Sequence, residues 1–206
     1  MYNTPDMADN SERGHRERLL EAAILCLQEK GYARTTSRDL VAVSGTNLAS
    51  IGYHFGSKEG LLNAAVAEAF QRWLKPLVAL AAEPGPATPL DRLQRGLAGV
   101  ADSFEENRPL VAAALEAWAQ LPRSDDLRAT MKAGYDDFHR AIAGTVRDAF
   151  AETGQDEVDA EALATFVIAL FDGLLVRWQL DPGDPPNVPR LTAAAQEALG
   201  ALAAPR

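Results

Sequence analysis

The chain has 206 residues, of which 47% are hydrophobic and 24% are charged, and its formal net charge is −9. Alanine and leucine dominate the apolar residues, which favours helices over sheets. Neither a run of about 18 apolar residues nor a secretory signal is present, so we expect no membrane association. The single cysteine, Cys26, excludes an internal disulfide, and the sequence therefore predicts a cytoplasmic protein.

The negative charge is unevenly distributed. Residues 1–62 carry 7 Lys and Arg against 8 Asp and Glu, whereas residues 63–206 carry 13 against 21. Most of the acidic charge therefore lies outside the first part of the chain, which weakens the objection to nucleic-acid binding there. No strongly basic patch is visible, so the non-specific DNA affinity should be modest.

The first elements are predicted in chain order as follows. Residues 1–18 form a polar, frayed arm, and an amphipathic helix spans about residues 12–30, with Gly31 as its left-handed stop. Thr36 and Asp39 make a capping box for a short second helix. That helix should bury Leu40 and Val43, and Gly45 should end it.

Asn47 can cap the next helix, residues 48–54, which should bury Ile51 and Phe55. Ser57 then caps a long helix that runs to about Ala82 and that Pro76 should bend. The three prolines of residues 83–89 mark a loop. Further helices are expected at residues 90–107, 110–121, 125–153, 158–180 and 189–202. No alternating strand pattern competes with them, so the fold class is all-α.

Residues 36–62 are the candidate DNA-reading element. A recognition helix needs an exposed N-terminal part and a buried opposite face. Residues 48–54 fit this requirement, with short or polar residues available to the groove. Asn47, Ala49, Ser50, Gly52 and Tyr53 can lie towards the groove, and of these Asn47, Ala49, Ser50 and Tyr53 are the candidate base contacts. The candidate phosphate contacts are Tyr53, His54, Lys58, Ser37 and Arg38. The alternative is a structural three-helix corner, with Tyr53 half-buried and Lys58 solvated.

Gly52 needs its own explanation, because glycine inside a short helix costs about 1 kcal/mol relative to alanine. A close approach of the backbone to DNA explains this cost, and a helix-packing contact explains it nearly as well.

Two later helices predict an interface. Apolar residues nearly encircle residues 158–180, and such a helix must be covered on all sides. A second copy of the chain can provide that cover through a four-helix contact, and the alternative is the central helix of a monomeric core. The candidate interface residues are Ile142, Val146, Phe166, Leu170 and Leu174.

Aromatic residues of the second part are candidates for lining an apolar ligand cavity. They are Phe104, Trp118, Tyr135, Phe138, Phe166 and Trp178, with His139 or Arg177 as a polar contact. Ordinary core packing is the alternative for each of them. The acidic charge of this part slightly favours a cationic or neutral ligand over an anionic one.

Catalysis is not expected. The three histidines are scattered, no His, Cys and carboxylate cluster has metal-ligand spacing, and no phosphate-binding glycine loop or nucleophile motif occurs. We therefore predict that the protein is not an enzyme and that it binds neither a metal ion nor a cofactor.

Residues 19–62, which include GY, TT, RDL and YHFGSKEGLL, resemble the DNA-binding domain of TetR-family transcriptional regulators. The resemblance implies an all-helical dimer with a three-helix helix-turn-helix domain at residues 11–60. It also implies a larger helical effector-binding and dimerisation domain at residues 61–206. The stretch ALFDGLLVRWQLDP is similar to the dimerising helix of many members. The chain departs from the family at Thr46 and Asn47 in the turn, and at Gly52, where tyrosine is frequent.

The function implied is a homodimeric repressor that binds a palindromic double-stranded DNA operator and is released by a small-molecule effector. The effector would tilt the helix of residues 58–82 and change the spacing of the two reading heads. The alternative is a dimeric DNA-binding or interaction protein without a small-molecule switch.

Overall fold

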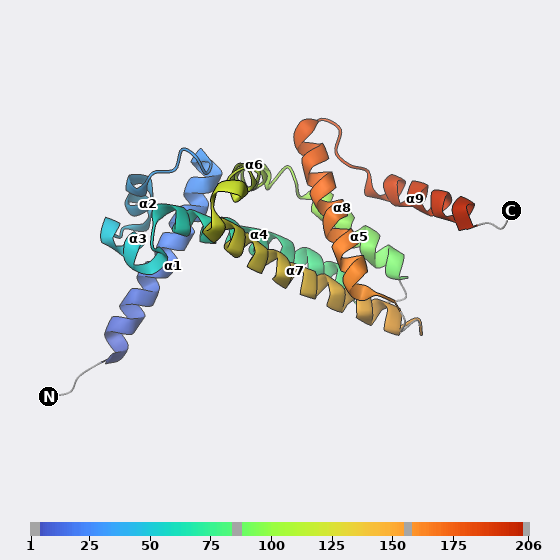
Figure 1. Cartoon of the computed structure of the whole chain (residues 1–206), viewed down its shortest axis with the longest axis horizontal. Coiled ribbons are helices and arrows are strands. Elements are labelled where there is room, and N and C mark those ends of the chain that lie inside the picture. Colours follow the sequence, from blue (N-terminus) through green and yellow to red (C-terminus); the bar gives the residue numbers. More distant parts are fainter. Residues whose placement is uncertain (1–4, 84–87, 155–157, 204–206) are drawn as a thin grey trace. The chain divides into compact units, whose positions relative to one another are not determined.

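The computed structural model describes residues 5–83, 88–154 and 158–203 (Figure 1). All the regular secondary structure in these ranges is helical, which confirms the all-α prediction. None of the helices in these ranges is long and apolar enough to cross a membrane. The elements are α1 (Pro5–Lys30), α2 (Ser37–Ser44), α3 (Leu48–Phe55), α4 (Lys58–Ala82), α5 (Pro89–Asp102), α6 (Arg108–Trp118), the 3₁₀ turn η1 (Leu121–Arg123), α7 (Asp125–Ala151), α8 (Ala160–Leu180) and α9 (Val188–Ala203).

The chain forms two compact units. Unit 1 contains the residues up to Gln71 together with Arg108–Gly134, and unit 2 contains Arg72–Asn107 together with the residues from Tyr135 onwards. The helices α4 and α7 each begin in unit 1 and end in unit 2. Unit 1 therefore includes α6 as well as the three N-terminal helices.

The core of unit 1 follows the helical spacing of the sequence. Leu19, Ala23 and Leu27 of α1 are fully buried, and Leu40 of α2 packs with them. The prediction for Val43 is wrong, because this side chain is 50% exposed. In α2 the buried face carries residues four apart, Leu40 and Ser44, and Val43 lies beside that face.

The beginning of α1 also differs from the prediction. The expected polar arm is helical from Pro5 onwards, whereas the remainder of that arm, residues 1–4, lies outside the described residues. Proline is well tolerated in the first turn of a helix because its missing N–H would have no partner there.

Side-chain caps fix the boundaries of several helices. Thr36 and Asp39 form the predicted capping box at α2, and the Asn47 side chain accepts from the Ser50 amide at α3. Gly31 and Gly45 adopt φ values of 80° and 63°, as a left-handed helix stop requires. A second capping box of the same kind, which was not predicted, is formed at α5 by Thr88 and Asp91.

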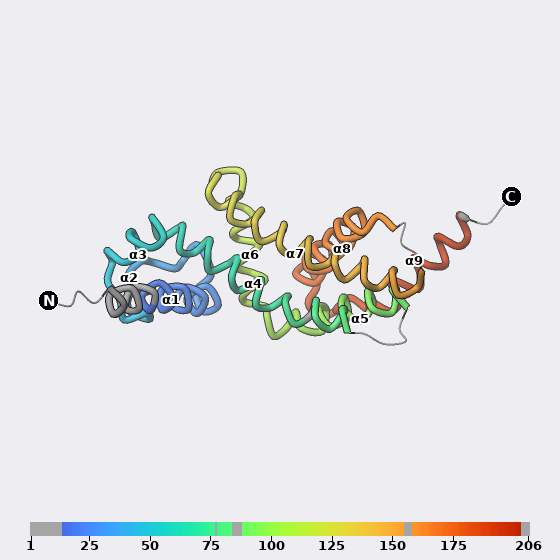
Figure 2. Tube along the Cα trace, turned by 90° about the horizontal axis from the view of Figure 1, so that it is seen from below, coloured from blue at the N-terminus to red at the C-terminus, as the bar shows by residue number. Residues whose placement is uncertain are grey.

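Unit 2 has an aromatic core. The rings of Phe104 and Trp178 are 5.3 Å apart, and Trp73 lies 6.1 Å from both Phe104 and Phe171. The Trp73 indole donates to the Ser103 hydroxyl at 2.8 Å. In the same unit, α5 packs against both α8 and α9, as the trace in Figure 2 shows.

One half-buried polar pair joins α7 to α8. The Tyr135 hydroxyl donates to the Asp172 carboxylate at 3.0 Å. Burial raises the pKa of Asp172 to about 6, although the bond from Tyr135 acts in the opposite direction. Burial also raises the pKa of Tyr135, with Asp172 as a further cause. The pair therefore contains a carboxyl group that is easily protonated.

The two matched capping boxes predict matched stabilities. Replacing Thr36 or Thr88 by alanine removes the oxygen that accepts from the third helical amide, so each change should lower the free energy of unfolding by about 1 kcal/mol. Chemical denaturation followed by circular dichroism measures this loss. Thr36→Ser and Thr88→Ser are the controls, because serine caps equally well. An alanine variant as stable as the unchanged chain would contradict the assignment.

Stability should depend on the ionisation of Asp172. A carboxyl whose folded pKa is raised destabilises the fold once ionised, so this cost is present above about pH 6 and disappears towards about pH 4. We expect Asp172→Asn to raise the melting temperature at about pH 7.5 and to lose most of this advantage at about pH 4.5. Asp137→Asn, on an exposed part of α7, is the control. A pH-independent effect would exclude the ionisation of Asp172 as its cause.

Candidate functional site

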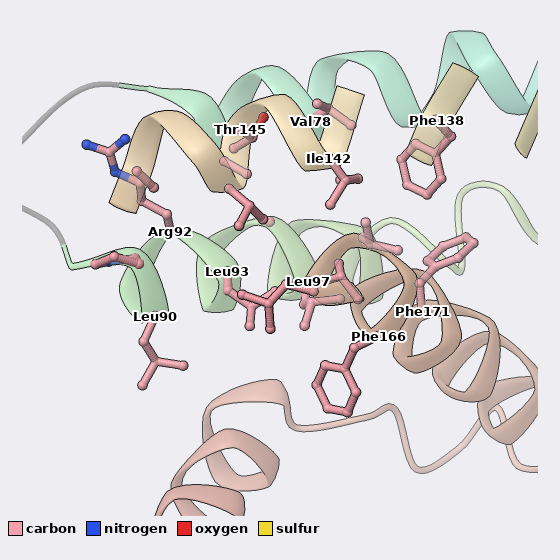
Figure 3. A pocket seen from close by; sticks show the side chains of 18 of the residues that line it. Val78, Leu90, Arg92, Leu93, Leu97, Phe138, Ile142, Thr145, Phe166 and Phe171 are labelled. Carbon is pink, nitrogen blue, oxygen red and sulfur yellow. The ribbon is translucent and has the colours of Figure 1, made fainter. Parts of the chain in front are cut away.

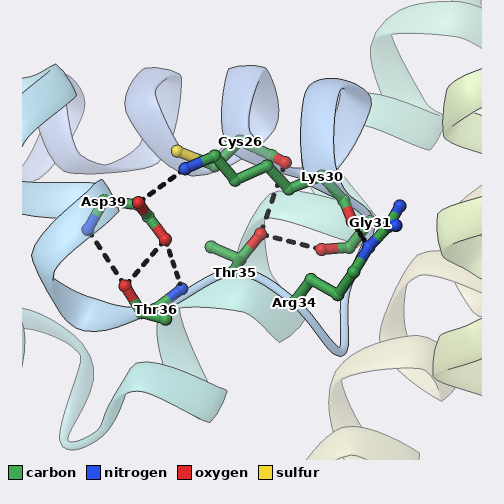
Figure 4. A network of polar contacts seen from close by, with 7 residues as sticks. All are labelled: Cys26, Lys30, Gly31, Arg34, Thr35, Thr36 and Asp39. Atoms are coloured by element: carbon green, nitrogen blue, oxygen red, sulfur yellow. Dashed lines mark hydrogen bonds and ion pairs between the residues drawn. The ribbon is translucent and has the colours of Figure 1, made fainter.

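A polar network sets the angle between α1 and α2 (Figure 4). The Lys30 ammonium lies 2.6 Å from the Asp39 carboxylate. The bond from Lys30 holds the pKa of Asp39 well below its usual range, and the bonds from Thr36 act in the same direction. The buried Thr35 hydroxyl donates to the Gly31 carbonyl at 2.8 Å. The end of α1 is thus tied to the start of α2 by charge-assisted bonds.

A close backbone approach fixes α4 against the end of α3. A Cβ atom at Gly60 would lie 2.2 Å from the carbonyl oxygen of Phe55, which real structures essentially never show. The Gly60 amide also donates to the Ser57 hydroxyl at 2.9 Å, so Ser57 caps α4 as predicted. Gly60 was not among the predicted functional residues, although a glycine in the first turn of a predicted helix is a signal for such a close contact.

Lys58 has a partner within the chain. Its ammonium donates to the carbonyl oxygen of Thr35 at 3.2 Å and lies 3.3 Å from the Glu59 carboxylate. It therefore supports the segment between α1 and α2, in addition to the phosphate contact expected from the sequence.

One face of α3 is open. Asn47, Ala49 and Gly52 are exposed, and Tyr53 is 71% exposed. Leu48, which the sequence reading missed, is 56% exposed on the same short helix.

The structure corrects the prediction that Ser50 faces the DNA groove. It is 8% exposed, and its amide and hydroxyl both bond to the Asn47 side chain. Ser50 and Ile51 form the buried side of α3, so Ser50 cannot point outward together with its neighbours Ala49 and Gly52.

Aromatic rings follow the exposed face. The rings of Tyr53 and His54 are 4.8 Å apart, and those of His54 and Phe55 are 6.4 Å apart. Phe55 is only half-buried, and the guanidinium of Arg16 lies 5.2 Å above its ring. Arg16 thus joins α1 to the end of α3 by a cation–π contact.

The environment of Gly52 removes one of its two explanations. Apart from its two chain neighbours and the backbone of α3 itself, no atom of the described residues lies within 4 Å of a Cβ built at this position. A packing contact inside the chain therefore does not account for the glycine.

The two candidate phosphate contacts at the start of α2 differ in exposure, since Arg38 is exposed and Ser37 is half-buried.

A cavity of about 230 Å³ lies within unit 2 (Figure 3). Side chains of α4, α5, α7 and α8 form its walls, and most of them are aliphatic or aromatic. The lining includes Leu74, Val78, Leu93, Leu97, Phe138, Ile142, Thr145, Val146, Phe150, Phe166 and Phe171, together with Arg92, whose guanidinium points away from the other lining side chains.

The expected cavity residues divide into two groups. Phe138 and Phe166 line this cavity, whereas Phe104 and Trp178 belong to the packed core. Tyr135 is held by Asp172, and a His139 ring nitrogen lies 3.0 Å from both the Glu161 carbonyl and the Thr165 hydroxyl. The Arg177 guanidinium lies 3.5 Å from Asp184, and Trp118 belongs to unit 1. The expectation of a cavity bounded by Trp118 together with Tyr135 is therefore corrected.

The five residues expected at the dimer interface lie in different environments. Ile142 and Val146 line the cavity, and Leu174 is buried within the single chain. Leu170 is half-buried, and Phe166 remains 61% exposed. The sequence suggested that α8 is apolar all round, but helix packing inside one chain already covers most of it. The exposed face of α8 carries mainly small and apolar residues at helical spacing, namely Ala162, Phe166, Ala169, Gly173, Val176 and Leu180; we call it the α8 stripe.

Known proteins match both parts of the chain. A family model described as bacterial regulatory proteins of the tetR family matches residues 19–65. A second model, described as BetI-type transcriptional repressor, C-terminal, matches residues 89–204. The HTH-type transcriptional regulator BetI of Burkholderia mallei is 25% identical over 191 residues, which cover 93% of this chain and 94% of that protein.

Solved structures share the fold. A protein of Pseudomonas aeruginosa PAO1 that is described as a transcriptional regulator aligns with a TM-score of 0.68 at 22% identity, over 91% of this chain and 89% of that one. A similarly described protein of Saccharomonospora viridis, solved in complex with choline, aligns with a TM-score of 0.60 at 27% identity, over 81% and 85%. With both domains matched and the helix-turn-helix geometry in place, the chain belongs to the TetR family of DNA-binding transcriptional regulators.

Proposed function

We propose that this regulator is a homodimeric repressor that binds a palindromic operator and that a small molecule bound in unit 2 releases it. The observation that carries the DNA contact is the open face of α3, where Gly52 has no packing neighbour in the described chain. Exposed short residues beside it leave room for the backbone to approach a base pair or a phosphate.

The roles of the α3 residues follow from their exposure. Asn47 and Ala49 lie at the exposed N-terminal end of α3, which is the end that a recognition helix presents to base edges. Leu48 is suited to a thymine methyl group. Tyr53, His54 and Lys58 are proposed to contact phosphates, with Ser37 and Arg38 on the flanking backbone. Ser50 has no such role, because it is buried.

The α8 stripe is the proposed dimer contact. Alanine and glycine side chains allow two helices to approach closely, and Phe166 adds apolar area at one end. A dimer formed through this stripe would present two α3 helices to successive major grooves, roughly 34–36 Å apart on DNA.

The cavity supports an effector site. Leu74, Val78 and Ala81 of α4 line it, and the same helix begins at Lys58, directly after the helix-turn-helix. A ligand that favours one arrangement of α4 would therefore act on the helix-turn-helix through the continuous helix that connects them. Ligand and DNA would then weaken each other by the same factor, as linkage requires. A cavity, rather than a close-packed core, favours this reading over a dimer without a switch, and the choline complex of the S. viridis relative adds support.

Gly52→Ala separates stability from DNA binding. Because alanine is the better helix former, this variant should be more stable by about 1 kcal/mol. The added methyl should nevertheless weaken binding to a fragment of the protein's own promoter, measured by gel shift, because it blocks the approach of the backbone. Gly134→Ala, also in a helix with open space around the new Cβ, is the control and should change stability alone. Equal DNA affinity in both variants would remove Gly52 from the interface.

Gly173→Glu tests the α8 stripe. Open space surrounds a Cβ at this position in the single chain, so the fold should persist, and the new carboxylate lies four residues before Arg177. Two like charges in a dimer contact should halve the mass found by analytical ultracentrifugation and abolish operator binding. Ala129→Glu, on an exposed part of α7 in unit 1, should change neither. A dimeric Gly173→Glu protein would place the interface elsewhere.

A further inference from the structure

The walls of the cavity in unit 2 are almost entirely apolar. Among the described residues that line it, only Arg92 and Thr145 have polar side chains. The Arg92 guanidinium pairs with Glu152 and points away from the other lining side chains (Figure 3). The Thr145 hydroxyl donates to the Ala141 carbonyl of its own helix at 3.2 Å. A molecule in the cavity therefore meets apolar surface on the walls that these residues form.

The described lining also lacks the groups that stabilise a bound cation. It contains no aspartate or glutamate, so a buried ammonium group would have no counter-charge. Tryptophan is the best cation–π partner, but Trp73 and Trp178 belong to the packed core of unit 2 and do not line the cavity. The aromatic residues of the lining are phenylalanines, and two of them, Phe138 and Phe171, meet edge to face with ring centroids 6.1 Å apart. A permanent cation would lose its hydration here and gain little in return.

An anion is disfavoured for a related reason. Arg92 is the only cationic residue among the described lining residues, and Glu152 already neutralises its charge. A ligand carboxylate in the cavity would therefore lose its hydration without meeting an unpaired positive charge. An uncharged ligand avoids this cost.

The volume of the cavity bounds the size of its ligand. The cavity measures about 230 Å³. An apolar protein cavity of about 150 Å³ holds one benzene molecule, so by proportion this cavity holds roughly nine carbon atoms. Each buried methylene strengthens binding about fourfold, so a molecule of this size can bind through burial of its apolar surface alone.

We propose that the effector of this regulator is an uncharged, hydrocarbon-like molecule of roughly nine carbon atoms, held in the cavity without a polar anchor. The inference rests on the proposed effector site and names the ligand class of that site. It also separates this chain from its choline-bound structural relative, because choline is a permanent cation.

Three probes that share a phenyl group test the charge class on the full chain. In tert-butylbenzene and phenyltrimethylammonium the attached groups have the same shape, and a carbon in the first replaces the charged nitrogen of the second. Benzoate supplies the anion. In calorimetric titrations, tert-butylbenzene should bind at least roughly tenfold more tightly than either charged probe, because it alone enters without losing a charged hydration shell. Equal or tighter binding of a charged probe would overturn the proposal, as would the absence of tert-butylbenzene binding.

Val78→Phe shows whether the hydrocarbon occupies this cavity. Val78 is a half-buried lining residue of α4, so the larger ring should take up space and weaken tert-butylbenzene binding by roughly tenfold. Val43→Phe is the matched control, because it makes the same change on an exposed part of unit 1. If Val78→Phe fails to fold, Val146→Phe on α7 makes the same test. Unchanged affinity in the folded cavity variant would place the probe elsewhere and contradict the proposal.

Acetophenone tests the absence of a polar anchor. Its ketone puts an acceptor where tert-butylbenzene has apolar groups, so it should bind roughly tenfold more weakly. Tighter binding of acetophenone would reveal a hydrogen-bond donor in the cavity and contradict the proposal. Loss of that advantage in Thr145→Val would assign the donor to the Thr145 hydroxyl.

Binding and release are measured separately, so that this proposal and the proposed function fail separately. Calorimetry without DNA tests the ligand class, and a gel shift with the same probes tests effector release. Tight tert-butylbenzene binding that leaves the DNA affinity unchanged would refute the switch and keep the ligand class of the cavity. Release of DNA by phenyltrimethylammonium or benzoate, but not by tert-butylbenzene, would keep the switch and refute the ligand class.

Discussion

The helix-turn-helix depends on the close approach of the Gly60 backbone to the carbonyl oxygen of Phe55. No side chain fits at position 60, so the first turn of α4 lies directly against the last residue of α3. This contact leaves Ile51 and Ser50 facing the interior and turns Asn47, Ala49 and Tyr53 outward. The Lys30–Asp39 pair and the cap at Thr36 then hold α2 against α1. Exposure of α3 is therefore a consequence of contacts at its two ends.

Local signals in the sequence predicted most of the helices. The capping residues Thr36, Asn47 and Ser57 act on backbone amides within three residues of themselves, so their effect is visible without tertiary structure. Side-chain exposure was harder to predict in short helices. An eight-residue helix turns little more than twice, so a neighbouring helix decides whether Val43 or Ser44 is covered. Ser50 was misplaced for the same reason.

The position of the cavity could not be predicted, because it depends on where four helices fail to fill the space between them. Aromatic residues suggested a cavity, yet Phe104 and Trp178 are buried against each other, with ring centroids 5.3 Å apart, and neither lines the cavity. The aliphatic lining of α5, such as Leu93 and Leu97, carries no signal that distinguishes it from an ordinary core. Arg92 carried no signal either, since an arginine four residues after the capping Thr88 suggests a surface residue until its burial is known.

Phe166 belongs to two surfaces at once. It lines the cavity of unit 2, and it is also 61% exposed on the α8 stripe. Whatever covers that stripe also covers part of the cavity wall, so occupancy of the cavity and association of the chain share a side chain. Association through this stripe would make the apparent affinity for any cavity ligand vary with protein concentration. A dissociation constant measured in dilute solution would then describe a different cavity from the one present in a crowded cell.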